Sequence, residues 1–244
     1  MRILLFLLPL LAGFVSAQEA PTASLRLLAL GELPPFRQEI RDGVRRELDP
    51  PVGSIPPRML EAGLPAAAEK DAKAPAFRLQ LGMLGLPAKV FPTEGKVKLR
   101  DPEQGDWAEI PCPAGAKTLA VLWRKGDSWK KPEVLALPDL AADDDPRVFR
   151  FVNVSPQAVG LVFGEKRLQL EAGKVLSLAL PDGARAVSVS VLFAGPGGAL
   201  KPCFSGMAEP RKGSATQYFI HRADGESPRR PVNVTPVSGL LATP

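Results

Sequence analysis

A succession of short segments, in which apolar and polar residues mostly alternate, constrains the fold of this chain more than any other feature. Such alternation places the apolar side chains on one face of a pleated strand and the polar side chains on the other. Turn signals such as Asp182-Gly183 separate the segments. The pattern predicts strands at residues 24–30, 96–100, 117–123, 147–154, 167–171, 174–180 and 186–193.

Proline supports the same fold class, because it makes up 27 of the 244 residues, about twice its usual share. Proline lacks the amide donor and clashes with the preceding helical turn, which argues against long helices. The hydrophobic residues, at 45%, are enough to form a buried core. Many short strands with frequent turns predict an all-β fold of sandwich or barrel type, with long proline-rich loops.

Two pairs of segments match in the same order along the chain. Residues 77–91 align without gaps on residues 149–163, and residues 113–123 align on residues 181–193. This internal repeat predicts two tandem β-sandwich-like (Ig-like) modules. The expected boundaries are a first module at 18–140, a linker at about 137–147, a second module at 147–237 and a tail at 238–244.

Residues 31–76 fit this repeat least well. Asp42-Gly43 favours a hairpin, because this pair suits the primed turns of hairpins. A short helix with Ile40, Val44 and Leu48 on one face is the alternative. The hairpin is favoured because Gly43 would cost about 1 kcal/mol inside a helix. The Pro/Ala-rich stretch at about 49–76 is expected to be a surface loop.

The N-terminus has the features of a secretory signal peptide. Arg2 precedes an apolar run at residues 3–15, and small residues lead to Ala17 before Gln18. The run is too short to serve as a membrane anchor, and no later stretch is long and apolar enough to span a bilayer. We therefore expect a periplasmic or secreted protein, cleaved after Ala17, with no transmembrane segment in the mature chain.

Charge and cysteine content narrow the partners. A net charge of +5 is compatible with acidic polymers without requiring them. Nucleic acid is not an expected partner, because the chain is predicted to be exported and no aromatic-basic binding motif is present. Cys112 and Cys203 are the two cysteines. In an exported chain they form either one disulfide or two free thiols, and the sequence leaves both open.

The sequence offers few groups for catalysis. His221 is the single histidine, so the multi-ligand nitrogen and sulfur sets of zinc sites cannot be built around it. Ser128 and Lys131 match Ser-x-x-Lys, but the companion motifs of that enzyme class are missing. We expect no catalytic residues, no metal ligands and no cofactor, with His221 as an ordinary surface or hydrogen-bonded histidine.

Trp129 is the strongest candidate for ligand binding, because Lys125, Lys130 and Lys131 flank it after a turn. An exposed indole among cations would stack on a sugar ring or meet an anionic glycan. The alternative is that Trp129 covers a sheet edge, with lysines that prevent edge-to-edge aggregation.

The phrases FVNVSP (151–156) and PVNVTP (231–236) are nearly identical. We interpret them as the first and last strands of the second module, each ended by a proline at a sheet edge. Asn153 and Asn233 also begin glycosylation sequons, although the following prolines make both poor acceptors.

Residues 147–183, with Arg150, Asn153, Ser155 and Pro156, resemble the opening of small bacterial cell-envelope β-sandwich domains. The resemblance implies fold and compartment, and no functional residue carries over. The expected function is an exported, non-enzymatic envelope interaction or accessory protein. A carbohydrate- or anionic-glycan-binding module is the alternative, and an unrecognised hydrolase is the second alternative. An envelope protein or a glycan is the expected partner, and the sequence fixes no oligomeric state.

Overall fold

The computed structural model describes residues 21–64, 73–140, 145–225 and 228–240. Within them the fold is all-β, as predicted, and the only helix is the single 3-10 turn Pro196–Gly198. None of the described residues belongs to a helix able to cross a membrane. The predicted signal peptide lies outside this part of the chain. The strands are β1 Ala23–Leu30, β2 Arg37–Arg41, β3 Val44–Leu48, β4 Met59–Ala62, β5 Ala76–Arg78, β6 Ala88–Val90, β7 Lys96–Asp101, β8 Gly105–Pro111, β9 Lys117–Lys125, β10 Ser128–Pro138, β11 Val148–Asn153, β12 Val159–Phe163, β13 Lys166–Leu170, β14 Val175–Ala179, β15 Val187–Ala194, β16 Leu200–Ala208, β17 Ser214–Arg222 and β18 Val232–Leu240.

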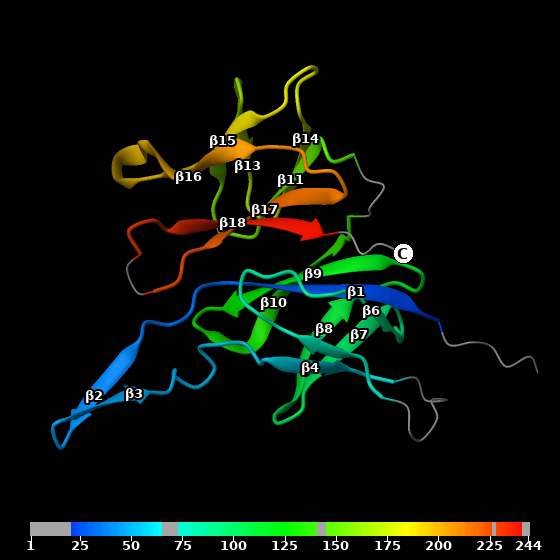
Figure 1. Ribbon diagram of the computed structural model, residues 1–244, viewed down its shortest axis with the longest axis vertical. Coiled ribbons are helices and arrows are strands. Elements are labelled where there is room, and N and C mark those ends of the chain that lie inside the picture. The colour runs from blue at the N-terminus through cyan, green and yellow to red at the C-terminus, as the bar shows by residue number, and fades with distance from the viewer. Residues whose placement is uncertain (1–20, 65–72, 141–144, 226–227, 241–244) are drawn as a thin grey trace, which may run out of the picture.

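Four four-stranded sheets and one hairpin contain these strands. Sheet A has the order β10-β9-β1-β6, and sheet C has the order β5-β4-β7-β8. Sheet D has the order β18-β17-β11-β14, and sheet E has the order β13-β12-β15-β16. Sheets A and C come from the first half of the chain, and sheets D and E come from the second (Figure 1). The hairpin β2–β3 is the two-stranded sheet B, and it pairs with none of these four sheets.

The two halves share one strand order. If β2 and β3 are set aside, β1 and β4 to β10 correspond in sequence to β11 to β18, and each pair occupies the same place in its sheet. The first strand of each half also pairs in parallel with the seventh, as β1 with β9 and β11 with β17. The hairpin is therefore an addition to the first half. Residues 31–58 join β1 to β4, whereas only residues 154–158 join β11 to β12.

The residue-by-residue alignment expected from the sequence is wrong. Phe77 lies in β5, at the edge of sheet C, whereas Phe149 lies in β11, inside sheet D. Residues 117–123 belong to β9, which corresponds to β17 and not to the β15 segment with which they were matched. Any alternating strand resembles any other at a period of two, so pattern alone could not identify the partners.

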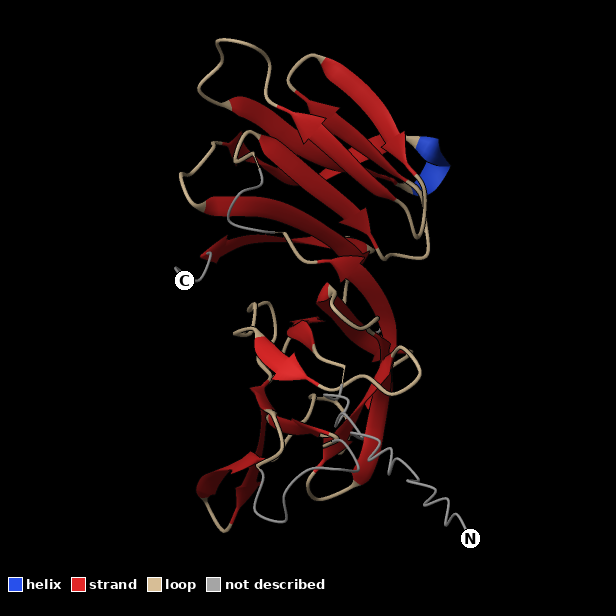
Figure 2. Ribbon diagram, turned by 90° about the vertical axis from the view of Figure 1, so that its right-hand side faces the viewer, coloured by secondary structure: helices blue, strands red, loops and turns tan. Residues whose placement is uncertain are grey.

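Three hydrophobic cores join the sheets into a stack with the order C, A, D, E. The first core lies between sheets A and C and includes Leu25, Leu27 and Trp107. The second lies between sheets D and E. The third joins the outer faces of sheets A and D, and includes Leu28 of β1 and Phe219 of β17. Figure 2 shows the two halves one above the other.

This stacking explains why some strands do not alternate in the sequence. Every residue of β1 except Ser24 is buried. The reason is that Leu25 and Leu27 face sheet C, while Leu28 and Leu30 face sheet D. Strands covered on both faces are apolar on both faces. β17 is also covered on both faces and is buried from Ser214 to His221, although it includes the polar residues Thr216 and Gln217.

Charged side chains are also buried at the junction of the halves. Arg26 of β1 forms an ion pair with Asp139 at 3.5 Å, and its Nε donates to the Gly85 carbonyl at 3.2 Å. Burial raises the pKa of Asp139, although the Arg26 guanidinium acts in the opposite direction. Arg150 of β11 donates to the Pro138 carbonyl of β10 at 2.8 Å, which ties the second half to the first.

Asn153 in FVNVSP is fully buried at the end of β11. Its Nδ2 donates to the carbonyls of Gln157 (2.9 Å) and Leu170 (3.0 Å), and its Oδ1 accepts from the amide (3.0 Å) and hydroxyl (2.6 Å) of Ser155. The motif thus fixes the turn between sheets D and E, and a fully buried Asn153 cannot accept a glycan.

The repeated phrase does not mark two neighbouring edge strands. β11 is an inner strand of sheet D, β18 is an edge strand, and β17 lies between them. β18 also continues to Leu240, so residues 238–240 belong to a strand and not to the expected tail. Within this last part of β18, a Cβ on Gly239 would lie 3.3 Å from Leu84 of the other half. The absence of a side chain at Gly239 therefore permits close packing between the halves.

The hairpin predicted at Asp42-Gly43 is confirmed. β2 and β3 pair in antiparallel fashion, with Arg41 opposite Val44 across a two-residue turn. Asp42 and Gly43 have φ values of 55° and 75°, as a primed turn requires. Of the proline-rich stretch at 49–76, residues 49–58 form a loop and residues 59–62 form β4, while 65–72 lie outside the described residues.

Candidate functional site

Trp129 does not project among lysines, as a sugar-stacking residue would. Its side chain is 1% exposed and belongs to the core between sheets A and C. Lys130 and Lys131 are exposed, and Lys125 is exposed and lies 3.6 Å from a carboxylate oxygen of Glu133. The prediction that Trp129 and the three lysines form one exposed cluster is therefore wrong. Of these four residues, only Trp129 and Lys130 line the same groove.

That groove has a volume of about 470 Å³. One wall is the loop and strand start at residues 50–59, and another is the β7–β8 turn at residues 101–104. Trp107 of β8 and Trp129 of β10 complete the lining, together with Lys130. Three segments far apart in the sequence therefore meet here.

The two indoles belong both to the lining of the groove and to the core between sheets A and C. Their ring centroids are 6.4 Å apart at an interplanar angle of 17°, and Trp107 Nε1 donates to the Trp129 carbonyl at 2.6 Å. Stacked, largely buried rings are rigid anchors. They hold the walls in place, because Trp107 also packs in the core between sheets A and C.

The proline wall is fixed at Gly53, between Pro50-Pro51 and Pro56-Pro57. The Trp129 amide donates to the Gly53 carbonyl at 2.8 Å. Gly53 has a φ of 76°, and a Cβ there would lie 3.2 Å from the Ser128 hydroxyl, so the position favours glycine. Prolines on both sides restrict the loop further, and the groove is thus largely preformed.

The lining is apolar with a few charged groups. Val52 is 89% exposed on the rim, and Ile55 and Met59 add further apolar surface. Charged residues of both signs line the same groove, as Arg58, Lys130, Asp101 and Glu103. A mainly apolar cleft of this size with a few polar groups has the character of a ligand site. Of the groove residues, the sequence analysis named only Trp129 and Lys130 as ligand-binding candidates, although the doubled prolines around Gly53 were a usable signal.

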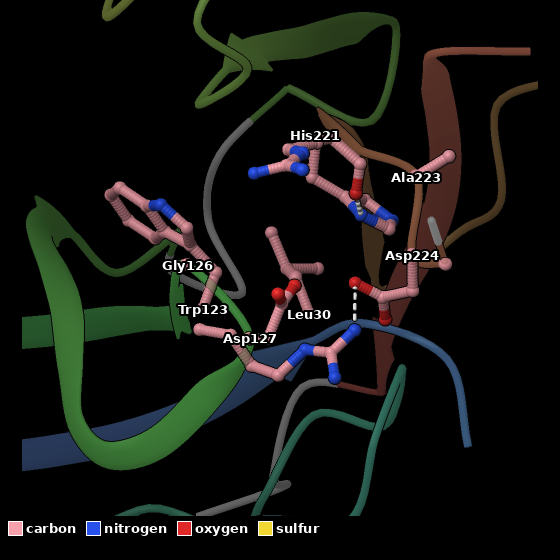
Figure 3. Close-up of a pocket in the computed structure, with 10 residues that line it drawn as sticks. Leu30, Trp123, Gly126, Asp127, His221, Ala223 and Asp224 are labelled. Atoms are coloured by element: carbon pink, nitrogen blue, oxygen red, sulfur yellow. Dashed lines mark hydrogen bonds and ion pairs between the residues drawn. The ribbon is translucent and has the colours of Figure 1, made fainter. Parts of the chain in front are cut away.

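A second, smaller pocket lies at the junction of the two halves. Trp123 lies across it from His221 and Asp224 (Figure 3). Its volume is about 20 Å³, which admits a single water-sized molecule and no substrate. Arg124 forms an ion pair with Asp224, which also accepts from the Glu32 amide at 2.6 Å. These contacts join β9 to the segments that follow β1 and β17, so the pocket is part of a structural contact between the halves.

His221 is hydrogen-bonded and buried, one of the two environments expected for it. Its Nδ1 donates to the Arg222 carbonyl at 3.0 Å, and its Nε2 accepts from the Thr235 hydroxyl at 3.0 Å. Burial lowers the pKa of His221, although Asp224 and Glu32 act in the opposite direction. A neutral imidazole with both nitrogens occupied serves the fold. No group of three metal-ligating side chains occurs among the described residues.

The two cysteines are free thiols in different cores. Cys112 belongs to the core between sheets A and C, and Cys203 to the core between sheets D and E. The disulfide allowed by the sequence therefore does not form, because sheets A and D lie between the two cores that hold the cysteines. Burial raises the pKa of the Cys203 thiol, which lowers its reactivity.

No protein-family model matches the sequence, and the search of curated proteins finds no relative.

Proposed function

We propose that this protein is an exported, non-enzymatic interaction protein, built from two β-sandwich-like modules, that holds an extended peptide segment of a partner in the groove above Trp107 and Trp129. The groove is the single observation that carries the proposal. Its volume of about 470 Å³ lies in the range typical of ligand sites.

The comparison of the two halves supports a binding role for this region. Residues 31–58 are added to a strand order that the second half completes with residues 154–158 alone. The addition supplies most of one groove wall, including Pro50, Pro51, Pro56 and Pro57. Long loops on a rigid β framework commonly carry binding functions.

A peptide fits the groove better than a glycan does. Sugar recognition by Trp129 would need an accessible ring face, and that side chain is 1% exposed. Apolar rim residues with charges of both signs suit an amphipathic peptide. A wall that is already restricted by prolines loses little conformational entropy on binding.

Peptide selection with paired controls tests the proposal. A displayed peptide library is selected on the full mature protein, and affinities of the selected peptides are measured by calorimetry. Met59→Arg places a long cation in the groove, whereas Met207→Arg makes the same change on the exposed surface of β16. We expect Met59→Arg to weaken binding by about tenfold or more, with Met207→Arg unchanged. No selected peptide, or equal binding to both variants, would overturn the proposal.

A further inference from the structure

The hairpin β2–β3 is the least covered part of the described fold. All residues of β2 and all but Leu48 of β3 are exposed, and the hairpin projects beyond the stacked sheets (Figure 1). Phe36, just before β2, is 64% exposed, and Ile40 is 70% exposed. A two-stranded sheet alone is marginal in water, and its unpaired edge is a template for another strand.

The register of the hairpin shows which backbone groups of β2 are available. The two-residue turn makes Arg41 and Val44 a hydrogen-bonded pair, so Arg37, Glu39 and Arg41 direct their amides and carbonyls toward β3. The amides and carbonyls of Gln38 and Ile40 consequently face away from β3, along the free edge.

We propose that this edge binds a second copy of the same chain. Residues 36–40 are Phe-Arg-Gln-Glu-Ile. When two copies run antiparallel about Gln38, each charged residue lies opposite one of the other sign, and each apolar residue lies opposite an apolar one. Two β2 strands paired in antiparallel fashion about a two-fold axis at Gln38 place Arg37 opposite the partner's Glu39, and Phe36 opposite the partner's Ile40. Gln38 and Ile40 then supply the ladder hydrogen bonds from the groups that face outward.

Opposite charges fall in the pairs where side chains are closest. Arg37 and the partner's Glu39 form the non-hydrogen-bonded pairs, whose Cα atoms are about 4.5 Å apart. Opposite charges at such positions stabilise a sheet, and like charges destabilise it. The axis at Gln38 produces this favourable pair twice, since a two-fold contact repeats each interaction.

Other registers are less favourable. A shift by two residues in one direction sets Glu39 against the partner's Glu39, and in the other direction it sets Arg37 against the partner's Arg37. A shift by four residues, which moves the axis to Ile40, sets Glu39 against the partner's Arg41. In that register the pairing runs into the turn at Asp42, and Phe36 has no partner residue. The edge of β3 is less favourable, because the register that pairs Arg45 with the partner's Glu47 also sets Arg46 against the partner's Arg46.

The dimer is independent of the groove, which is built from residues 50–59, 101–107 and 129–130. A contact made by one pair of short strands is small, and association is expected to be weak and concentration-dependent. Sedimentation velocity of the full mature chain, at protein concentrations up to about 1 mM, therefore measures the self-association. The wild-type chain is expected to form dimers, and a monomer at every concentration would overturn the proposal.

Charge exchange tests the pairing. Arg37→Glu and Glu39→Arg should each weaken self-association by about tenfold or more, because like charges then face each other. An equimolar mixture of the two variants should dimerise again, since every charged pair is then opposite in sign. Glu165→Arg and Lys166→Glu, in and beside the exposed turn before β13, are the matched controls and should leave dimerisation unchanged. Single variants that still dimerise, or a mixture that does not associate, would contradict the pairing.

Cysteine cross-linking tests the register. Gln38→Cys should oxidise to a symmetric disulfide dimer, because paired Cα atoms at the axis lie about 5.5 Å apart. Ile40→Cys should not, because its copies would be four residues out of register, about 13 Å apart along the strand. Cys112 and Cys203 are buried and do not compete. Cross-linking through Ile40→Cys in preference to Gln38→Cys would exclude the Gln38 axis.

Discussion

Replacement of Asn153 by alanine should destabilise the second half of the protein severely. The change removes two donated hydrogen bonds, at 2.9 and 3.0 Å, and two accepted ones, at 3.0 and 2.6 Å. Each bond contributes about 1 kcal/mol net, and the carbonyls of Gln157 and Leu170 lose a buried donor. We expect the free energy of unfolding to fall by about 3–5 kcal/mol, and Tm by about 6–20 °C.

Asn233→Ala is the matched control, because Asn233 stands in the same Val-Asn-Val phrase but donates to Glu32 in an exposed bond of 2.7 Å. Its expected cost is about 1 kcal/mol. Urea denaturation followed by far-ultraviolet circular dichroism gives both values. A cost of less than about 1 kcal/mol for Asn153→Ala, or equal costs for the two variants, would refute the role given to the buried network.

Three further predictions concern titration, thiols and processing. Burial lowers the pKa of His221 below its ordinary 6.5, so the unfolded chain binds the proton more tightly than the folded chain does. The free energy of unfolding should therefore fall as pH drops below about 6.5. His221→Gln should flatten this pH dependence in urea titrations, and an unchanged profile would contradict the prediction. Cys112 and Cys203 should react with a thiol reagent only after unfolding, because both are buried; a disulfide on a non-reducing gel would contradict this. The mature protein recovered from the periplasm or medium of a bacterial host should begin at Gln18 by N-terminal sequencing; an intact leader on that material would argue against export.

The sequence predicted the local structure well where apolar and polar residues alternate. Strands expected at 96–100 and 186–193 are observed as β7 and β15, and the Asp42-Gly43 turn is observed in the hairpin. These features depend on neighbours in the chain, which a local pattern records. The all-β class followed from the same evidence.

Strands with irregular pairing or two covered faces were harder to predict. In β10 the pairing register shifts between Ser128 and Glu133, next to Pro132, so the alternation is interrupted there. In β17 both faces are buried, because sheet D packs on sheets A and E. Polar residues such as Thr216, Gln217 and His221 interrupt β17, so its sequence contains no local signal that both of its faces are covered.

The candidate site was predicted only in fragments. Trp129 attracted attention because cations flank it in sequence, yet the indole is buried in the core while Lys130 and Lys131 are exposed. Its partners in the groove come from residues 50–59 and 101–107, which only the folded chain brings together. The pairing register of β10 shifts between Ser128 and Glu133, so regular alternation does not apply there and the sequence cluster was not a spatial one.

Hydrogen–deuterium exchange with a saturating selected peptide tests the central claim most directly, because it locates the binding surface along the whole chain. The proposed function predicts slower exchange at residues 50–59 and 101–107, with sheet E unchanged. Slower exchange on sheet E, or no change along either wall of the groove, would contradict it.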